Sequence, residues 1–276
     1  MQSRLDDHTD ERDSETSGEV TVTQPNRCLS IRLSGPWGHF RRVEGNTVKT
    51  TYRIIPRTTV AGLLAAVLGI DRNQYYDLFG PDVSAIAIEP TSELRTMNLP
   101  VNNLTTSTEG LKGVNTRGKV SVYYPDPTED RQRTNYEVLV DPEYRIDVWL
   151  DDDETYRTLR QYFEDGLAHY TPSLGLSEYL VEIEFLGEYE VRSVENTGTA
   201  TVDSAVPDAD GVVPEPGVSY GTERSPGFMK RTAEPGEFTG RRTTEYITYT
   251  YSPEAEPLTV SDVTGVAVDG RTVVFR

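Results

Sequence analysis

The sequence predicts an α+β fold: a mixed domain of helices and strands, followed by a smaller β-rich part. Two short helical patterns alternate with strand-like runs through the first two thirds of the chain, whereas residues 228–276 hold only strand-like runs and turns. With 276 residues, of which 36% are hydrophobic, the chain is long enough to bury a sizeable core.

The first strand is CLSIRLS (Cys28–Ser34), in which apolar and polar residues alternate, and we expect Cys28 to be buried in it. A helix follows Pro56, with Thr58 or Thr59 as its N-cap and Gly69 as its terminating residue. Its apolar residues recur at helical spacing: Val60, Leu63, Leu64, Val67 and Leu68.

Strand-like runs follow at Val83–Ile88 and Arg145–Leu150, separated by a long polar excursion over residues 98–135. A second helix should begin near Asp152 or Asp153, whose carboxylates suit the positive end of the helix dipole. Four residues form its expected apolar face: Tyr156, Leu159, Phe163 and Leu167. The next strand is predicted at Tyr179–Leu186.

The predicted order is strand, helix, strand, strand, helix, strand, which is the ferredoxin-like arrangement with a large insertion between its second and third strands. We therefore divide the chain into an acidic, disordered tail (1–26), this domain (27–192), a flexible insertion (193–227) and a β-rich C-terminal part (228–276). In the last part a strand is expected at Tyr246–Tyr251, and Asp269-Gly270 predicts a two-residue hairpin turn.

The composition is strongly acidic, with 45 acidic and 27 basic residues and a formal net charge of −18. Only four residues are lysines, a pattern that suits a cytoplasm of molar salt. The single cysteine excludes an intramolecular disulfide, and the longest apolar run, Val60–Ile70, is about half the ~20 residues that cross a bilayer. We expect a cytoplasmic protein with no membrane partner, cofactor or metal.

One stretch departs from this acidity. Between Arg27 and Ala61 lie seven basic residues and one acid, a local balance of +6. Trp37 and Phe40 in this stretch could stack on bases or fill the core, and its arginines could meet phosphates. A turn followed by a charged, solvent-exposed face would have the same sequence pattern, so the positive charge alone does not decide whether this stretch binds nucleic acid.

Catalytic and metal sites have little support. Only His39 of the three histidines lies among cations and aromatic residues, and surface or capping roles account better for His8 and His169. The acidic run Asp151–Glu154 is better explained as a solvated helix start than as a metal site. Neither GxxxxGK[ST] nor a GxGxxG after a strand is present.

Three motifs identify a family resemblance: GPWGHFRR (35–42), TTYRIIPRTTVAGLLAAVLG (50–69) and HYTPSLGLSEY (169–179). Together they resemble the CRISPR-associated Cascade subunit of family five, over roughly residues 27–192. The resemblance implies an RNA-recognition-type domain whose thumb spans 98–135, without the aromatic RNP code. It implies binding of the guide RNA 5′ handle and contacts with the Cascade backbone and large subunits. The acidic composition fits a halophilic archaeal type I-B member.

One branch of the family, the type I-C members, cuts precursor RNA without a metal, using a tyrosine, a lysine and a histidine. Tyr52 could correspond to the tyrosine, and Lys112 or Lys119 to the lysine, but no histidine lies between His39 and His169. A non-catalytic RNA-capping subunit is therefore the main hypothesis, and a metal-independent endoribonuclease is the alternative.

The thumb carries a second basic patch, because no acid lies between Leu111 and Tyr124. We expect Val114 to insert beside a base while the neighbouring cations hold the backbone. The predicted RNA-binding residues are Trp37, His39, Phe40, Arg41, Arg42, Lys49, Tyr52, Arg53, Arg57, Lys112, Arg117 and Lys119.

Overall fold

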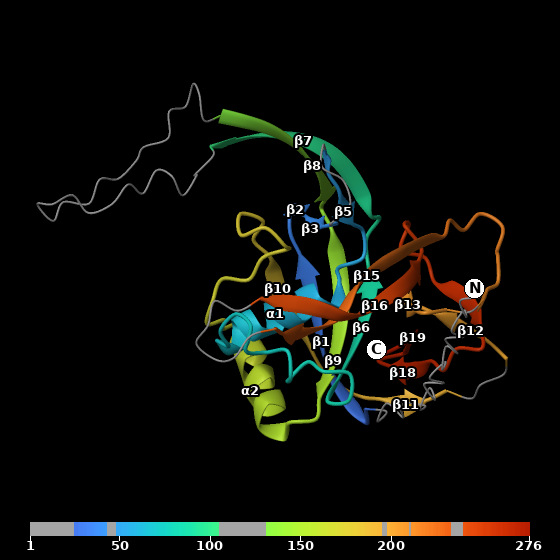
Figure 1. Ribbon diagram of the computed structural model, residues 1–276. Helices are drawn as coiled ribbons and strands as arrows, with labels where there is room; N and C mark the ends of the chain where they lie inside the picture. The colour runs from blue at the N-terminus through green and yellow to red at the C-terminus, as the bar shows by residue number, and fades with distance from the viewer. Residues whose placement is uncertain (1–24, 43–47, 105–130, 195–197, 210, 233–239) are drawn as a thin grey trace, which may run out of the picture.

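A computed structural model of the chain describes residues 25–42, 48–104, 131–194, 198–209, 211–232 and 240–276. At its centre is a four-stranded sheet in which every neighbouring pair is antiparallel, in the order β10-β1-β9-β6 (Figure 1). These strands are β1 (Arg27–Ser34), β6 (Ser84–Pro90), β9 (Glu143–Leu150) and β10 (Glu182–Glu190). Helix α1 (Arg57–Leu68) lies between β1 and β6 in the chain, and α2 (Asp153–Glu164) between β9 and β10. The α+β class is confirmed.

Both helices bury the apolar faces that their spacing predicts. In α1 the buried residues include Val60, Leu64 and Val67, and in α2 they are Tyr156, Leu159 and Phe163. The two helices contact each other, and α2 also packs against β9 and β10. The apolar spacing predicts Leu167 on the same face of the second helix, but α2 ends at Glu164 and the Leu167 side chain is exposed.

The helix ends differ in how well they were predicted. Asp152 caps α2 by accepting a hydrogen bond from the Thr155 amide (3.0 Å), and Gly69 ends α1 at a φ of 75°. The expected threonine cap of α1 is wrong, because the helix begins earlier and its N-cap residue is Pro56. Proline fixes its own φ near the required value, and its carbonyl accepts the Val60 amide (3.1 Å).

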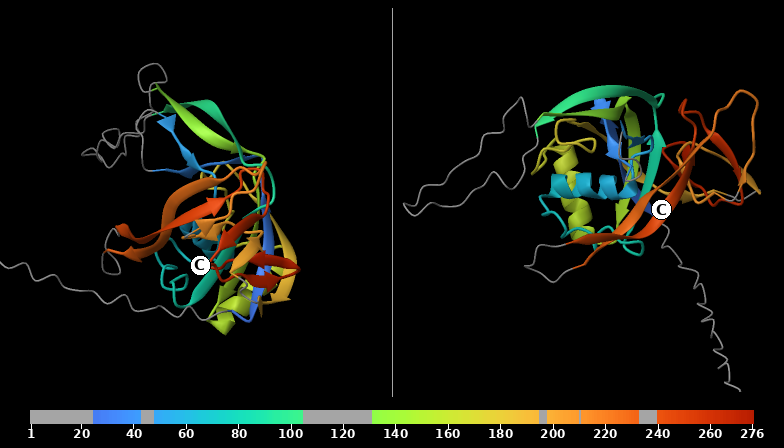
Figure 2. Two further views of the ribbon diagram at one scale, coloured as in Figure 1. Left: turned by 90° about the vertical axis from the view of Figure 1, so that its right-hand side faces the viewer. Right: turned by 45° about the horizontal axis from the view of Figure 1, so that its top comes forward.

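A long hairpin occupies the described ends of the predicted thumb. Strands β7 (Arg95–Leu104) and β8 (Arg131–Val140) pair antiparallel along their whole length, and Figure 2 shows the hairpin curving away from the sheet. The excursion over 98–135 carries no clear strand period in the sequence, so its pairing and its limits are findings of the structure. Residues 105–130, which include Val114, lie outside the described residues.

Four short strands precede α1: β2 (Trp37–Gly38), β3 (Phe40–Arg41), β4 (Val48–Lys49) and β5 (Thr51–Tyr52). β2 pairs antiparallel with β8, and β4 pairs parallel with the same strand. β3 pairs with β5. The basic stretch of the sequence therefore folds onto the base of the β7–β8 hairpin (Figure 1).

The C-terminal part consists of three small sheets, ordered β11-β18-β19, β12-β17-β14 and β13-β16-β15. Their bounds are β11 (Arg192–Ser193), β12 (Thr199–Val202), β13 (Val206–Pro207), β14 (Gly211–Val212), β15 (Gly221–Arg231), β16 (Arg241–Tyr251), β17 (Leu258–Ser261), β18 (Val266–Val268) and β19 (Arg271–Val273). The predicted turn at Asp269-Gly270 joins β18 to β19.

The flexible insertion expected at 193–227 is corrected, since β12, β13, β14 and the start of β15 lie within it. Val202 and Val206 are buried in a cluster with Leu258 and Val260, on strands that come much later in the chain. Pro, Gly and Asp in the connections obscure these short strands, which are stabilised by distant partners.

The C-terminal part is held against the central sheet by its last strands. Arg276 exchanges backbone hydrogen bonds with Ile86 of β6 (3.0 and 3.1 Å). On β19, Arg271 pairs with the buried carboxylate of Asp147 (3.0 Å), which also accepts a hydrogen bond from Ser30. The acidic tail (1–24) lies outside the described residues.

Candidate nucleic-acid interface

The short strands β2–β5 pack closely against one another and against β8, at the base of the β7–β8 hairpin. Phe40 lies opposite Tyr52, and the Phe40 amide donates to Thr51 Oγ1 (2.8 Å). The Thr51 amide donates to the carboxylate of Glu137 on β8 (3.1 Å). Backbone and short polar side chains thus fix this segment against the hairpin, and the larger side chains point either inward or to solvent.

Four of the predicted RNA contacts point inward: His39, Phe40, Tyr52 and Arg57 are all buried. Phe40 packs near Tyr144 of β9, with 6.2 Å between ring centroids, and the Arg42 guanidinium lies 5.1 Å from the Tyr52 ring centroid. In this structure the core covers these four side chains, which support the surface from below. That they contact RNA directly stays a prediction, to which their burial gives no support.

His39 is 1% exposed, and its Nδ1 donates to the Glu137 carbonyl oxygen (2.8 Å). Burial lowers the pKa of this imidazole below its ordinary value, so the ring is uncharged at neutral pH. Nε2 has no hydrogen-bond partner among the described residues. This neutral, enclosed ring links the connection between β2 and β3 to β8, and it carries no positive charge that could bind a phosphate.

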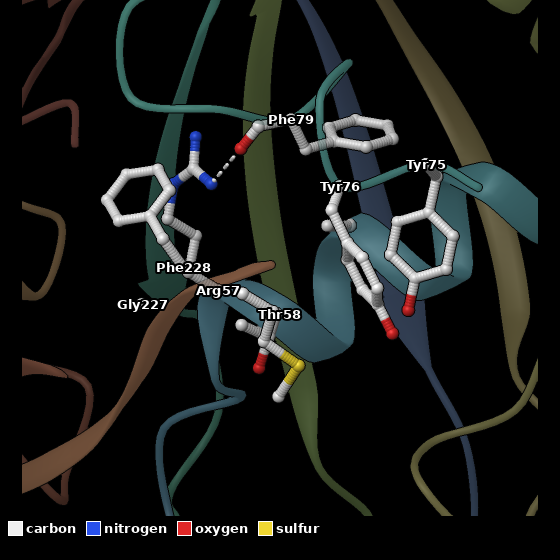
Figure 3. A pocket seen from close by; sticks show the side chains of 9 residues that line it. Arg57, Thr58, Tyr75, Tyr76, Phe79, Gly227 and Phe228 are labelled. Carbon is white, nitrogen blue, oxygen red and sulfur yellow. Dashed lines mark hydrogen bonds between the residues drawn. The ribbon is translucent and has the colours of Figure 1, made fainter. Parts of the chain in front are cut away.

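Arg57 is buried at the start of α1 and ties four parts of the chain together (Figure 3). Its guanidinium donates to the carbonyls of Arg276 (2.9 Å) and Phe79 (2.8 Å) and to Ser84 Oγ (2.7 Å). The Phe228 ring covers it, with 4.1 Å from Cζ to the ring centroid. Burial lowers the pKa of Arg57 to about 10, which still leaves it charged at neutral pH.

The local balance of +6 is largely cancelled in the folded chain. Arg27 pairs with Asp153 (2.6 Å), and Arg32 pairs with Glu184 (2.5 Å). Both acids come from elements more than a hundred residues later, where counting along a stretch of sequence does not find them. Among the residues that the structure describes, only two cations of the stretch remain in reach of solvent and outside any ion pair, Arg41 and Lys49.

Sequence analysis missed the acid beneath this surface, Glu223 of β15. It is buried and accepts hydrogen bonds from the amides of Arg53 (2.7 Å) and Ile54 (3.2 Å). The guanidinium groups of Arg42 and Arg53 lie 3.6 and 3.8 Å from its carboxylate. Burial raises the pKa of Glu223, and the two amides and the two arginines oppose that shift. No local signal in the sequence points to this residue, because its partners are 170 residues away.

The third sequence motif (169–179) packs directly against the first (35–42). The His39 amide donates to the Leu174 carbonyl (3.0 Å), and Gly175 has a φ of 95°. A Cβ at Gly175 would lie 2.0 Å from the His39 carbonyl oxygen, so only glycine fits there. At Gly35 a Cβ would lie 2.8 Å from the Leu180 carbonyl. The three sequence motifs are therefore brought together at one place.

Fewer of the predicted RNA-binding side chains reach solvent than the sequence suggests. Arg41 is exposed, and four further side chains are partly exposed: Trp37, Arg42, Lys49 and Arg53. Three predicted thumb contacts, Lys112, Arg117 and Lys119, lie outside the described residues. Trp37 and Lys49 lie opposite Val140 and Tyr136 of β8, so the reachable side chains border the hairpin on its inner end.

In the described part of the chain no three His, Cys, Asp or Glu side chains gather closely enough to hold a metal ion. Asp153 of the acidic run pairs with Arg27, and Asp152 caps the helix. None of the described helices is long and apolar enough to span a membrane.

Solved structures and protein families were compared with the chain. A CRISPR protein from Archaeoglobus fulgidus matches over 91% of this chain and 99% of its own, at 14% identity and a TM-score of 0.50. A chain of a structure described as a CRISPR RNA-guided surveillance complex matches over 85% of this chain and 91% of its own, at 14% identity and a TM-score of 0.48. A search of curated proteins found no match. The family model described as CRISPR-associated protein (Cas_Cas5) matches residues 28–250. The chain belongs to the Cas5 family of CRISPR-associated proteins.

Proposed function

We propose that this protein is a non-catalytic subunit of a type I CRISPR interference complex (Cascade), in which it binds and caps the 5′ handle of the guide RNA. In this proposal the central sheet with α1 and α2 is an RNA-recognition-type, ferredoxin-like domain, and the β7–β8 hairpin is the base of its thumb. The strand order β10-β1-β9-β6 and the position of the hairpin between the second and third strands support that assignment.

The observation that carries the proposal is the placement of Arg41 and Lys49. Both lie at the root of the hairpin, both reach solvent, and neither is paired with an acid among the described residues, although the chain has a net charge of −18. The partly exposed Trp37 pairs with the same strand as Lys49, opposite Val140 of β8, and supplies an aromatic face. Unpaired cations and an aromatic ring along one strand suit the phosphates and bases of single-stranded RNA.

The remaining parts of the proposal rest on family membership and composition. As a Cas5 family member the chain would contact the backbone subunit and the large subunit of the complex, and so bridge them. The acid excess and the low lysine count favour a halophilic archaeal type I-B system and a cytoplasm of high salt. At molar salt the Debye length is about 3 Å, so binding must depend on direct contacts.

The alternative function, cleavage of repeat RNA, needs an acid and a base that can reach the substrate. Tyr52 and His39 are buried, and the His39 ring is fixed by Glu137. His169 lies against Gly69 at the end of α1. It forms an exposed pair with Tyr170, with 4.7 Å between ring centroids, but this pair does not include Tyr52, the tyrosine of the predicted set. The burial of Tyr52 and His39 favours the non-catalytic role.

The proposal predicts that Arg41→Gln with Lys49→Gln weakens binding of a 5′-handle RNA by roughly 2 to 5 kcal/mol, because each cation makes charge-assisted bonds to the RNA. Fluorescence anisotropy of labelled handle RNA at fixed salt measures the change. The matched control is Arg157→Gln with Arg160→Gln on α2, which removes the same charge from a different surface. Equal affinities of the two variants would refute the proposed site.

The same RNA also tests the alternative function. Incubation with a repeat RNA in EDTA should leave the RNA intact, since a separate enzyme would process it. Site-specific cleavage that disappears on Tyr52→Phe or Lys119→Ala would establish the endoribonuclease.

A further inference from the structure

The outer end of the β15–β16 hairpin places cations directly opposite cations. In the register of this pair, Lys230 faces Arg242 and Arg231 faces Arg241, and all four side chains are exposed. Residues 228–232 and 240–244 contain no acid. The connection at 233–239, which holds Glu234 and Glu237 in the sequence, lies outside the described residues.

Such an arrangement works against the stability of the hairpin by itself. Like charges directly opposite each other on antiparallel strands are destabilising. Among the described residues, ten other arginines form ion pairs with acids, Arg27 and Arg32 among them, but none of these four cations does. Successive pairs of a ladder point to opposite faces, so Arg231 and Arg241 share one face of the hairpin and Lys230 and Arg242 share the other. A like-charged pair on each face, in a protein of net charge −18, indicates that an anionic partner neutralises this end of the hairpin.

A groove adjoins these cations on the side of α1. It runs between α1, the segment 171–175 and the hairpin, which passes beside α1 (Figure 2). Its lining includes Arg241 and Met229 from the hairpin, Thr59 from α1, Tyr75, and the hydroxyl residues Thr171 and Ser173. Gly62 and Gly175 also line the groove. Hydroxyl donors, one cation and an aromatic ring suit phosphate and sugar oxygens.

A second aromatic ring lies along the same hairpin. Tyr246 is 45% exposed, and the Arg224 guanidinium lies 4.9 Å from its ring centroid. Exposed aromatic rings that alternate with arginines are the platform on which proteins stack the bases of single strands. An acidic peptide would engage the cations but would leave the hydroxyl groove and the Tyr246 face unused, so the observations favour nucleic acid.

We propose that the outer end of the β15–β16 hairpin and the adjoining α1 groove form a second binding surface, which holds the phosphate backbone of single-stranded nucleic acid without reading its sequence. The proposal rests on the proposed function only in taking nucleic acid as the ligand class. The surface is distinct from the β2–β5 site, because Glu223 under that site and Arg231 are eight residues apart on β15, about 26 Å along a strand.

The test uses the full-length protein, a labelled oligouridylate of about 15 nucleotides, and the variant Arg231→Gln with Arg241→Gln. We expect at least a tenfold loss of affinity at about 0.1 M salt. The slope of log K against log salt should become shallower by about 1.4, since each phosphate contact of a single strand contributes about 0.7. The control, Arg157→Gln with Arg160→Gln, should keep the wild-type slope.

Two further measurements make the outcome decisive. Because the substitution relieves like-charge repulsion, the melting temperature of the hairpin variant should be unchanged or raised. Photocrosslinking of 4-thiouridine oligonucleotide to the wild-type protein should mark peptides that contain Tyr75, Met229 or Tyr246. Unchanged oligouridylate affinity and slope, or crosslinks confined to the β2–β5 segment, would overturn the proposal.

A protein partner gives a different pattern. If the variant binds oligouridylate normally but fails to join its partner subunits, the surface meets an acidic protein and the nucleic-acid proposal is wrong. The proposed handle site fails separately, when Arg41→Gln with Lys49→Gln leaves handle binding unchanged while the hairpin variant weakens oligouridylate binding.

Discussion

At the scale of single residues, the basic surface around Arg42 and Arg53 depends on a buried acid, Glu223. Glu223 is buried beneath Arg42 and Arg53 and accepts two backbone amides at the turn that leads into α1. Its carboxylate fixes the backbone from which these two arginines project. Removing both acceptor oxygens would leave two amides without partners in a buried place, at a cost of about 1–3 kcal/mol for each.

Glu223→Gln keeps one acceptor oxygen and removes the charge, so it separates these two effects. Burial raises the pKa of Glu223 above its ordinary value, so the folded state binds this proton more tightly than the unfolded state does. The stabilising contribution of a raised carboxyl pKa is full below the unfolded-state value and is lost as the pH rises through the folded-state value.

We therefore expect the free energy of unfolding of the wild type, relative to Glu223→Gln, to fall as the pH rises from about 4 to about 8. Urea titrations of both proteins over this range measure the difference. Glu223→Ala should be less stable than either at every pH, because the amides of Arg53 and Ile54 then lack an acceptor. A difference that grows with pH would mean that the two arginines outweigh burial.

At the scale of elements, the segment 172–176 locks the β2–β3 strands in place. Leu174 accepts the His39 amide, and Gly175 lies so close to the His39 carbonyl that a methyl group cannot be added without moving one of the two segments. Strands β2 and β3 thus owe their position to a loop that follows α2, and to β8 on the other side.

Gly175→Ala should destabilise the protein by roughly 3 kcal/mol or more, since it combines overlap with the strain of a left-handed residue. Gly166→Ala is the matched control: it has a φ of 63° and nothing within 4 Å of a Cβ, so it should cost only about 1–2 kcal/mol. Chemical denaturation of both variants measures the two losses. Equal losses would show that the contact with His39 does not restrict the loop.

The elements that were predicted well are those with a local signal. The two helices and the strands of the central sheet follow from apolar periodicity and from caps such as Asp152 and Gly69, which act within a few residues. The C-terminal strands lack such a signal: β12 and β13 are short, and Val202 is buried only because β17 pairs with it. The long β7–β8 pairing likewise depends on contacts between distant residues.

The sequence motifs mark the segment that folds against β8, and its role in RNA binding stays a prediction. The sequence cannot tell that Arg57 turns inward to carbonyls while Arg41 turns outward. Nor can it tell that Glu137 and Glu223 arrive beneath the cations from other strands. Whether the remaining side chains contact RNA stays a prediction.

At the scale of the whole molecule, the fold decides which cations pair with acids and which stay unpaired. Most of the basic stretch meets acids from distant elements, and buried pairs such as Arg271 with Asp147 hold the C-terminal sheets against the central one. The cations that stay unpaired among the described residues include those at the root of one hairpin and those at the end of another. An acidic protein with two such places can bind a polyanion locally while the rest of its surface repels it.

The acidic N-terminal tail fits this division of charge. Residues 1–19 contain seven acids and two bases and almost no large apolar side chains, so they have little to bury and should be repelled by RNA. A protein that begins near Glu19 should keep its melting temperature and should bind handle RNA at least as well as the full chain. Any gain in affinity should be largest at low salt and vanish at about 1 M salt, where the Debye length is only about 3 Å.

Calorimetry and anisotropy titrations of the two proteins measure these quantities. A fall of several degrees in melting temperature would show that the tail packs on the fold, and a loss of affinity at constant stability would show that it takes part in binding.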